Sequence, residues 1–114
     1  MEFLNKIILR GIVQNILVAT VDDKRCVTLS VLTQQTHKGN DGSIVVEHQW
    51  FLCRAWEGQG ICSEDIGKIK RTDWVELTGR VKTISYTRAD GTSGYNWEVS
   101  VQKTTLLDKE ENSR

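Results

Sequence analysis

Alternating apolar side chains, in segments bounded by turn residues, constrain the fold of this chain most. Residues 7–21 are rich in β-branched and aliphatic side chains, are interrupted by Gly11, and end in the polar cluster 22–24. Because strands have a side-chain period of two and favour β-branched residues, this segment predicts a long first strand that bends at Gly11 and ends in a turn. Residues 26–33 alternate in the same way and predict a second strand.

Three more strands and one helix complete the predicted fold. The strands have the same pattern and lie at residues 44–56, 74–88 and 94–101, with turn clusters at 38–43 and 89–92. Residues 61–70 predict a short helix, because Ser63 suits the N-cap, acidic residues follow it and lysines come last. Three strands, a helix and two strands is the order of an oligonucleotide/oligosaccharide-binding (OB) fold. The sequence therefore predicts an all-β, five-stranded, Greek-key OB-fold barrel with one short helix between strands 3 and 4.

The chain has the size of one domain. We expect residues 1–107 to form it and residues 108–114 to be a short polar tail, since the 114 residues contain no internal repeat and no proline. Lysine and arginine number 15, as do aspartate and glutamate, so the formal net charge is zero. This balance argues against a nucleic-acid partner, because phosphate binding usually accompanies a basic domain. Net charge does not locate the charges, however, and a local basic patch can still bind a ligand.

The sequence has no signature of catalysis, metal binding or secretion. Cys26, Cys53 and Cys62 lack paired C-x-x-C spacing, and His37 and His48 have no partner at metal-ligand spacing. The first ten residues are too polar for a signal peptide, and no run approaches the ~20 apolar residues of a membrane span. We therefore expect a non-enzymatic cytoplasmic protein with reduced cysteines, without metal, cofactor or membrane partner.

Alternation of strand side chains separates the third and fourth strands into an inner and an outer face. The inner face is apolar and comprises Phe51, Cys53, Ala55, Val75, Leu77, Gly79 and Val81. The outer face interleaves aromatic and cationic side chains and comprises Trp50, Leu52, Arg54, Trp56, Arg80, Lys82, Ile84, Tyr86 and Arg88. Aromatic rings stack on bases of any sequence, and cations contact the phosphates. One alternative stays open, in which these aromatics are core residues and the cations a solvated surface.

The other large aromatics are assigned by the same alternation. Tyr95 and Trp97 are in phase with Val99 and Val101, which predicts core positions for both. Trp74 stands at a strand end, and the pattern assigns it no role.

Six short stretches carry a family resemblance. They are residues 5–11, 27–31, 47–58, 75–81, 86–91 and 95–99. By the order and spacing of these stretches, the chain resembles the bacterial single-stranded DNA-binding protein (SSB) family from about Asn5 to Val101. That resemblance implies single-stranded DNA as the partner, a location at the nucleoid in the cytoplasm, and a homotetramer or a dimer built on the first strand. Family members usually end in an acidic tip that recruits repair and replication enzymes, whereas this chain ends at residues 108–114, so we do not expect recruitment of that kind.

The predicted binding residues combine the outer face with this resemblance. The family's stacking positions match Trp50, Trp56 and Tyr86, and His37 stands near a further one as a weaker platform. Phosphate contacts are predicted for Arg54, Arg80, Lys82, Arg88 and Lys38.

Two functions stay open at this point. The first is sequence-tolerant binding of single-stranded DNA during DNA replication, repair or recombination, which the basic aromatic face favours. The alternative is an OB-fold protein–protein adaptor, such as a primosome-like assembly factor, in which Trp50 and Trp56 contact a protein. Zero net charge and the missing acidic tip favour the adaptor.

Overall fold

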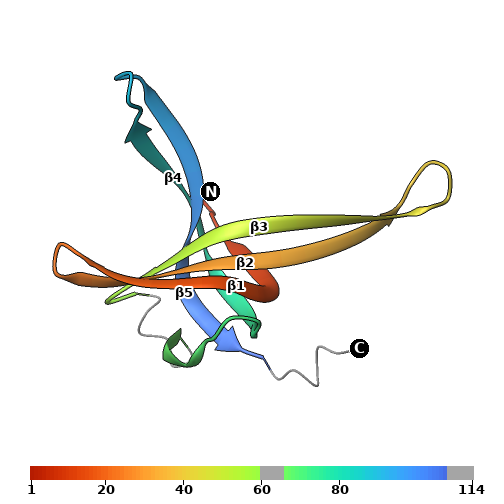
Figure 1. The fold of residues 1–114 in the computed structure, drawn as a ribbon, viewed down its shortest axis with the longest axis horizontal. Coiled ribbons are helices and arrows are strands. Elements are labelled where there is room, and N and C mark those ends of the chain that lie inside the picture. The colour runs from red at the N-terminus through yellow and green to blue at the C-terminus, as the bar shows by residue number, and fades with distance from the viewer. Residues whose placement is uncertain (60–65, 108–114) are drawn as a thin grey trace.

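Five long strands close into one barrel in the computed structural model (Figure 1). The structure describes residues 1–59 and 66–107. The strands are β1 (Ile7–Val21), β2 (Lys24–Lys38), β3 (Ile44–Trp56), β4 (Trp74–Thr87) and β5 (Ser93–Leu106). They are hydrogen-bonded in the order β1-β2-β3-β5-β4, and β1 closes the barrel against β4. Only the β3–β5 pair is parallel among the described strands, so the predicted all-β OB-fold barrel is confirmed.

The connection between β3 and β4 differs from the helix that the sequence predicts over residues 61–70. The described part of it forms a single 3₁₀ turn, η2 (Ile66–Lys68), and Ser63, the predicted N-cap, lies outside the described residues. Ile66 and Ile69 are both buried in the core cluster. A 3₁₀ turn aligns side chains three residues apart, so one turn seats both isoleucines without an α-helix. No described helix has the length and apolar character that crossing a membrane requires.

β2 and β5 are longer than their sequence patterns predict. β2 continues through the polar residues 34–38, and β5 continues to Leu106. Both extensions pair in register with a neighbouring strand, as Lys38 does with Ile44. Cross-strand pairing therefore prolongs the strands where the apolar alternation has ended.

The barrel interior is filled by small and branched apolar side chains. Its most completely buried members are Val13, Leu29, Val31, Cys53, Val75, Leu77 and Val101. Two glycines allow close approach of strands, because a Cβ on Gly11 would collide with the carbonyl of Leu32, and one on Gly79 with the carbonyl of Ser100. Gly11 lies where β1 passes from its pairing with β4 to its pairing with β2. The predicted bend thus falls at the change of partner.

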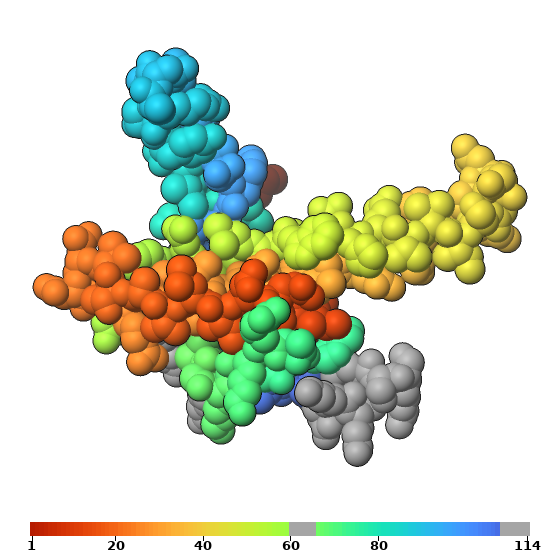
Figure 2. Space-filling model, viewed as in Figure 1, coloured from red at the N-terminus to blue at the C-terminus, as the bar shows by residue number. Residues whose placement is uncertain are grey.

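The β2–β3 and β4–β5 hairpins extend beyond the barrel and give the molecule an open shape, and the β1–β2 hairpin projects on the side opposite to the β2–β3 hairpin (Figure 1). We call residues 33–49, at the far ends of β2 and β3, the β2–β3 arm, and residues 82–97, at the far ends of β4 and β5, the β4–β5 arm. Both arms leave the barrel from the short parallel seam of β3 and β5, where Cys53 pairs with Val99 and Arg54 with Ser100. From the seam the arms diverge, as Figure 2 shows, so the surface between them is open.

Candidate functional site

The outer face of β3, β5 and β4 carries the aromatic and cationic side chains that alternation predicts for it. Trp50 is 62% exposed and Tyr86 is 42% exposed, while Trp56 is half-buried. Arg80 and Lys82 are exposed on the same side of β4. The alternative in which these aromatics fill the core is wrong, because the opposite faces of the same strands occupy the interior.

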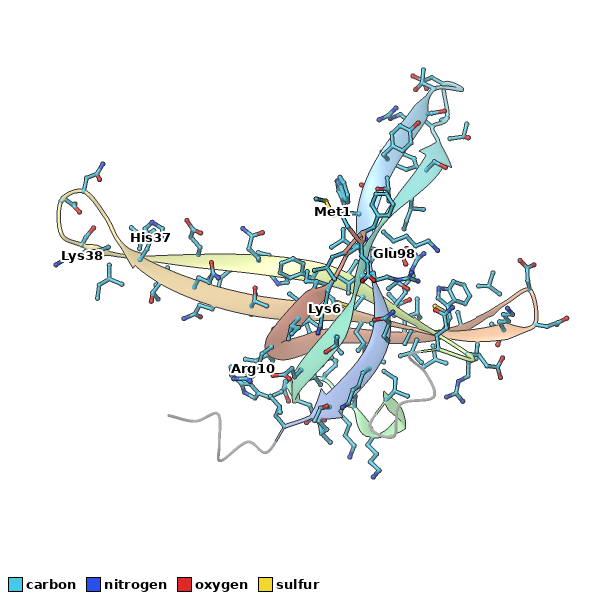
Figure 3. The ribbon with its side chains drawn as sticks, turned by 180° about the vertical axis from the view of Figure 1, so that it is seen from behind. Met1, Lys6, Arg10, His37, Lys38 and Glu98 are labelled. Carbon is cyan, nitrogen blue, oxygen red and sulfur yellow. The ribbon has the colours of Figure 1, made fainter. Side chains whose placement is uncertain are left out.

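A buried carboxylate lies beneath this face, beside the seam. Glu98 is 5% exposed, and its Oε1 accepts a hydrogen bond of 3.2 Å from Nη1 of Arg54, whose side chain is 37% exposed. Figure 3 labels Glu98 near the base of the β4–β5 arm. Arg54, predicted to contact phosphate, is thus already committed in part to an acid 44 residues away in sequence. No spacing of acidic residues in the sequence distinguishes Glu98, because its role depends on the pairing of β3 with β5.

Tyr86 is held in place by its neighbours across the β4–β5 arm. It lies opposite Gly94, and its ring occupies the space that a Cβ on Gly94 would need. The guanidinium of Arg88 lies 5.4 Å from the centre of the Tyr86 ring, and its Nη1 donates a hydrogen bond of 2.6 Å to the carbonyl of Ser93. Arg88, predicted to contact phosphate, therefore orients the platform and the turn.

The β2–β3 arm carries both histidines of the chain, on opposite faces. His48 shares the face of Trp50, with ring centres 6.1 Å apart. Its Nε2 donates a hydrogen bond of 3.2 Å to Oε1 of Gln34. His37 has the other phase along β2, and its Nδ1 lies 3.7 Å from Oε1 of Glu47. Figure 3 shows His37 and Lys38 at the far end of this arm, well away from Glu98. The structure therefore does not bring these two predicted contact residues together with the rest of the site.

Trp97 and Tyr95 are exposed, which contradicts the core positions predicted for them. Their side chains are 69% and 67% exposed. Both do share the face of Val99 and Val101, which are buried. The prediction was wrong because only the part of β5 from Val99 onward lies in the barrel. Tyr95 and Trp97 precede it, in the arm, where the same face of the strand is exposed to solvent. Alternation gives the face of a residue but not the place where the barrel ends.

Two hollows lie where the arms leave the barrel. The first, which we call the barrel-mouth cleft, has a volume of about 250 Å³ and is lined by Ile7, Trp50, Phe51, Leu52, Val81, Trp97, Glu98 and Val99. The second, the cationic hollow, has a volume of about 210 Å³ and is lined by Asn5, Arg80, Val81, Lys82 and Ser100. The two hollows share Val81, whose backbone is hydrogen-bonded in both directions by the side chain of Asn5. The N-terminal segment thereby helps to form this side of the barrel mouth.

Charge on the arms is unevenly distributed. At each tip an aspartate accepts hydrogen bonds from a hydroxyl and a backbone N–H: Asp41 from Ser43, and Asp90 from Thr92. These bonds, the hydroxyl one above all, lower the pKa of both carboxyl groups, so both aspartates are ionised at neutral pH. Arg80 and Lys82 lie nearer the barrel and make no ion pair among the described residues. Both signs of charge therefore occur at the tips, where Lys38 and Arg88 are exposed, while Arg80 and Lys82 place positive charge where the β4–β5 arm begins.

The described residues hold no cluster of histidine, cysteine and acidic side chains suited to a metal ion. Cys53 is fully buried, and burial, with a smaller effect of the Glu98 charge, raises its pKa to about 12. A thiol in that state is a poor nucleophile and a poor ligand at neutral pH.

Comparison with known proteins gives matches among solved structures alone, since no family model and no curated protein matches the chain. A Plasmodium falciparum SSB in complex with ssDNA has a TM-score of 0.78 at 16% identity, covering 95% of this chain and 98% of that one. A deletion mutant of the single-stranded DNA-binding protein from Thermus aquaticus has a TM-score of 0.77 at 12% identity, covering 92% and 51%. A small single-stranded DNA-binding protein from Streptomyces coelicolor has a TM-score of 0.67 at 14% identity, covering 95% and 99%.

These similarities establish the fold of the chain. It spans nearly all of the Plasmodium and Streptomyces chains and about half of the Thermus chain. The barrel therefore has the form of the OB fold that these single-stranded DNA-binding proteins share, as the sequence resemblance implies.

Proposed function

We propose that this OB-fold chain is a non-enzymatic module that binds single-stranded DNA without sequence preference, in DNA replication, repair or recombination. The observation that supports the proposal is the outer face of β3, β5 and β4, where exposed Trp50 and Tyr86 accompany exposed Arg80 and Lys82. Stacking on a ring contributes about 1–3 kcal/mol per base, and cations follow the phosphates. Such a face suits unpaired bases, whereas the bases of a duplex are already stacked on each other. One protein of the same fold was solved in complex with ssDNA.

The proposed contacts differ in how free each side chain is. Trp50, Trp56 and Tyr86 are the stacking platforms, and Arg80 and Lys82 are the main phosphate contacts. Arg54 and Arg88 are secondary phosphate contacts, because Glu98 and Ser93 already accept hydrogen bonds from them. Lys38 and His37 contact only a strand that follows the β2–β3 arm to its tip. The expected location, with such a ligand, is the nucleoid in the cytoplasm.

Self-association is part of the proposal, as a homotetramer or a dimer built on β1. Among the described strands, residues 7–10 of β1 pair with β4 alone, so the other backbone edge of this segment makes no strand pairing. Ile8 on the same segment is 57% exposed. An unpaired strand edge readily accepts a second strand. Sedimentation velocity tests this part: a species near the 13.0 kDa of one chain at micromolar concentration contradicts it.

A protein–protein adaptor is the second candidate function. The observation that favours it is the exposure of large apolar side chains outside the stacking face, including Phe3, Leu4 and Leu17. Exposed apolar patches mark protein interfaces as well as ligand sites. The two candidates differ in the response of the protein to nucleic acid.

The experiment that separates them is intrinsic tryptophan fluorescence during titration with a thymine oligomer, with a duplex of equal length as control, at two salt concentrations. Single-strand binding predicts strong quenching by the oligomer alone, weaker at the higher salt, because stacking quenches tryptophan and counterions are released. Folded protein that responds to neither nucleic acid at low salt contradicts the proposal and favours the adaptor.

A further inference from the structure

Trp97 lies outside the stacking face, yet its ring is as accessible as that of Trp50. Both tryptophans line the barrel-mouth cleft, Trp50 from β3 and Trp97 from β5. We propose that this cleft is a base-binding subsite, in which one base of a bound single strand inserts against Trp50 and Trp97. This inference rests on the proposed single-strand binding and adds one subsite and one contact residue to it.

The size and lining of the cleft suit a single base. Its volume of about 250 Å³ is below the ~300–1,000 Å³ typical of pockets for drug-sized ligands. Most of its lining is apolar and includes Ile7, Phe51, Val81 and Val99. Val99 belongs to the core, and Ile7 and Phe51 pack against it. A flat base gains contact with this lining, whereas a phosphate would lose its hydration there without a partner.

Charge around the cleft favours the same occupant. Glu98 is the acidic group in the lining, and Arg54, 3.2 Å away, compensates its charge. The cations Arg80 and Lys82 line the cationic hollow, which adjoins the cleft at Val81. An apolar surface and a cationic surface are therefore adjacent, as a base and its own phosphate require.

The subsite is continuous with the proposed stacking face. Trp50 belongs to both, since it is exposed on the outer face and also lines the cleft. Tyr86 and Trp97 have opposite phases along the β4–β5 arm, so one base cannot stack on both rings. A strand that reaches Trp50 from the outer face therefore meets the cleft at the seam, where a base can turn inward to Trp97.

The test measures the affinity of a fluorescent thymine oligomer for four proteins: the parent, Trp97→Ala, Trp97→Phe and the control Leu17→Ala. Leu17 is 64% exposed on β1 and lines neither hollow. Leu17→Ala therefore controls for the loss of an exposed apolar side chain away from the cleft. We expect Trp97→Ala to weaken binding about 5- to 150-fold, and Trp97→Phe and Leu17→Ala to stay within about twofold of the parent. Thermal unfolding of each variant checks that the barrel is intact, which the exposure of Trp97 leads us to expect.

A double variant tests whether the two tryptophans share one base. If they do, Trp50→Ala with Trp97→Ala loses less than the product of the two single losses, by at least about twofold. Strictly multiplicative losses overturn the shared subsite.

The remaining outcomes separate this inference from the proposed function. If Trp97→Ala binds as the parent does while Trp50→Ala is weakened, the subsite is wrong and single-strand binding stands. If Trp97→Ala keeps its affinity but loses mass in sedimentation, the cleft is a contact between copies, which also overturns the subsite. If the parent protein does not bind the oligomer at all, the proposed function is wrong, and so is this inference.

Discussion

Nη1 of Arg54 lies 3.2 Å from Oε1 of Glu98, which joins a half-exposed cation on β3 to a buried acid on β5. Arg54 belongs to the parallel seam of two residue pairs between β3 and β5, and Glu98 lies next to it in sequence, so this ion pair stabilises the junction of the two strands. A buried charge without its partner is costly.

The first prediction concerns the stability that this ion pair provides. Arg54→Ala should lower the free energy of unfolding by about 1–3 kcal/mol, less than the ~3–5 kcal/mol of a fully buried pair, because solvent screens the guanidinium. Adding Glu98→Gln should recover part of the loss, since no buried charge is then left alone. Urea unfolding of the single and double variants measures both effects. An unchanged midpoint in Arg54→Ala contradicts the role of the pair.

The second prediction concerns the stacking face. Trp50→Ala, Trp56→Ala and Tyr86→Ala should each weaken single-strand binding by about 1–3 kcal/mol, because each removes a ring that one base contacts. Equilibrium titration with a thymine oligomer measures the change, with Leu17→Ala as the control. The stacking model is wrong if all three variants bind as tightly as the parent.

The third prediction concerns the seating of Tyr86. In Gly94→Ala the new methyl group would meet Cζ of Tyr86 and Nη2 of Arg88, so the ring must swing away. Binding should weaken by up to the loss seen for Tyr86→Ala, while the free energy of unfolding changes by less than about 1 kcal/mol, since an exposed side chain can yield. Gly67→Ala is the matched control, because nothing lies within 4 Å of its Cβ position. Parental affinity in Gly94→Ala would show that the observed ring position is not needed for binding.

The fourth prediction concerns salt. Arg80→Ala and Lys82→Ala should each reduce the slope of log K against log salt concentration by about 0.7, because one fewer counterion contact is made with a single strand. Lys24→Ala, at the turn between β1 and β2, should leave the slope unchanged. Titrations at four salt concentrations measure the slope for the parent and for each variant. If Arg80→Ala and Lys82→Ala keep the slope of the parent, neither residue contacts a phosphate.

The fifth prediction concerns the thiol of Cys53, whose pKa is raised to about 12 chiefly by burial. The folded state holds this proton more tightly than the unfolded state, so the stability that it contributes is complete below pH 9 and is lost between about pH 9 and 12. Iodoacetamide at pH 8 should therefore leave Cys53 unmodified until urea unfolds the chain. Peptide mass mapping locates the modified cysteines, and rapid labelling of Cys53 in the folded protein contradicts its burial.

Periodicity predicts much of this fold because the barrel strands follow it closely. β1 and β3 have the bounds that the apolar runs suggest. The predicted inner set is buried except for Phe51 and Val81, which are half-buried. The same reasoning places Trp50 and Tyr86 outside, because it needs only the phase of each strand.

The wrong or missing predictions have a common physical cause. The pattern along one strand does not tell which residues of other strands lie nearby. Trp97 has a core phase but lies beyond the end of the barrel, and Glu98 finds Arg54 only through the parallel seam. His37 lies in the part of β2 beyond the predicted strand, and on the other face from Trp50. Side-chain alternation within one strand cannot show where the barrel ends or which residue of another strand pairs with a given side chain. Nor can it show which residues of two paired strands share a face.

The arms are continuous with the barrel strands, so one strand contains residues of very different local stability. β3 runs without a break from fully buried Cys53 to Ile44, which is 77% exposed. A two-stranded ribbon by itself is marginally stable, and the free energy of local opening ranges from near zero to the global value. Each strand thus has a root fixed by the core and a tip held by its cross-strand bonds. A ligand bound along the arms, as proposed above, would cover one face of each ribbon and would therefore stabilise the tips more than the roots.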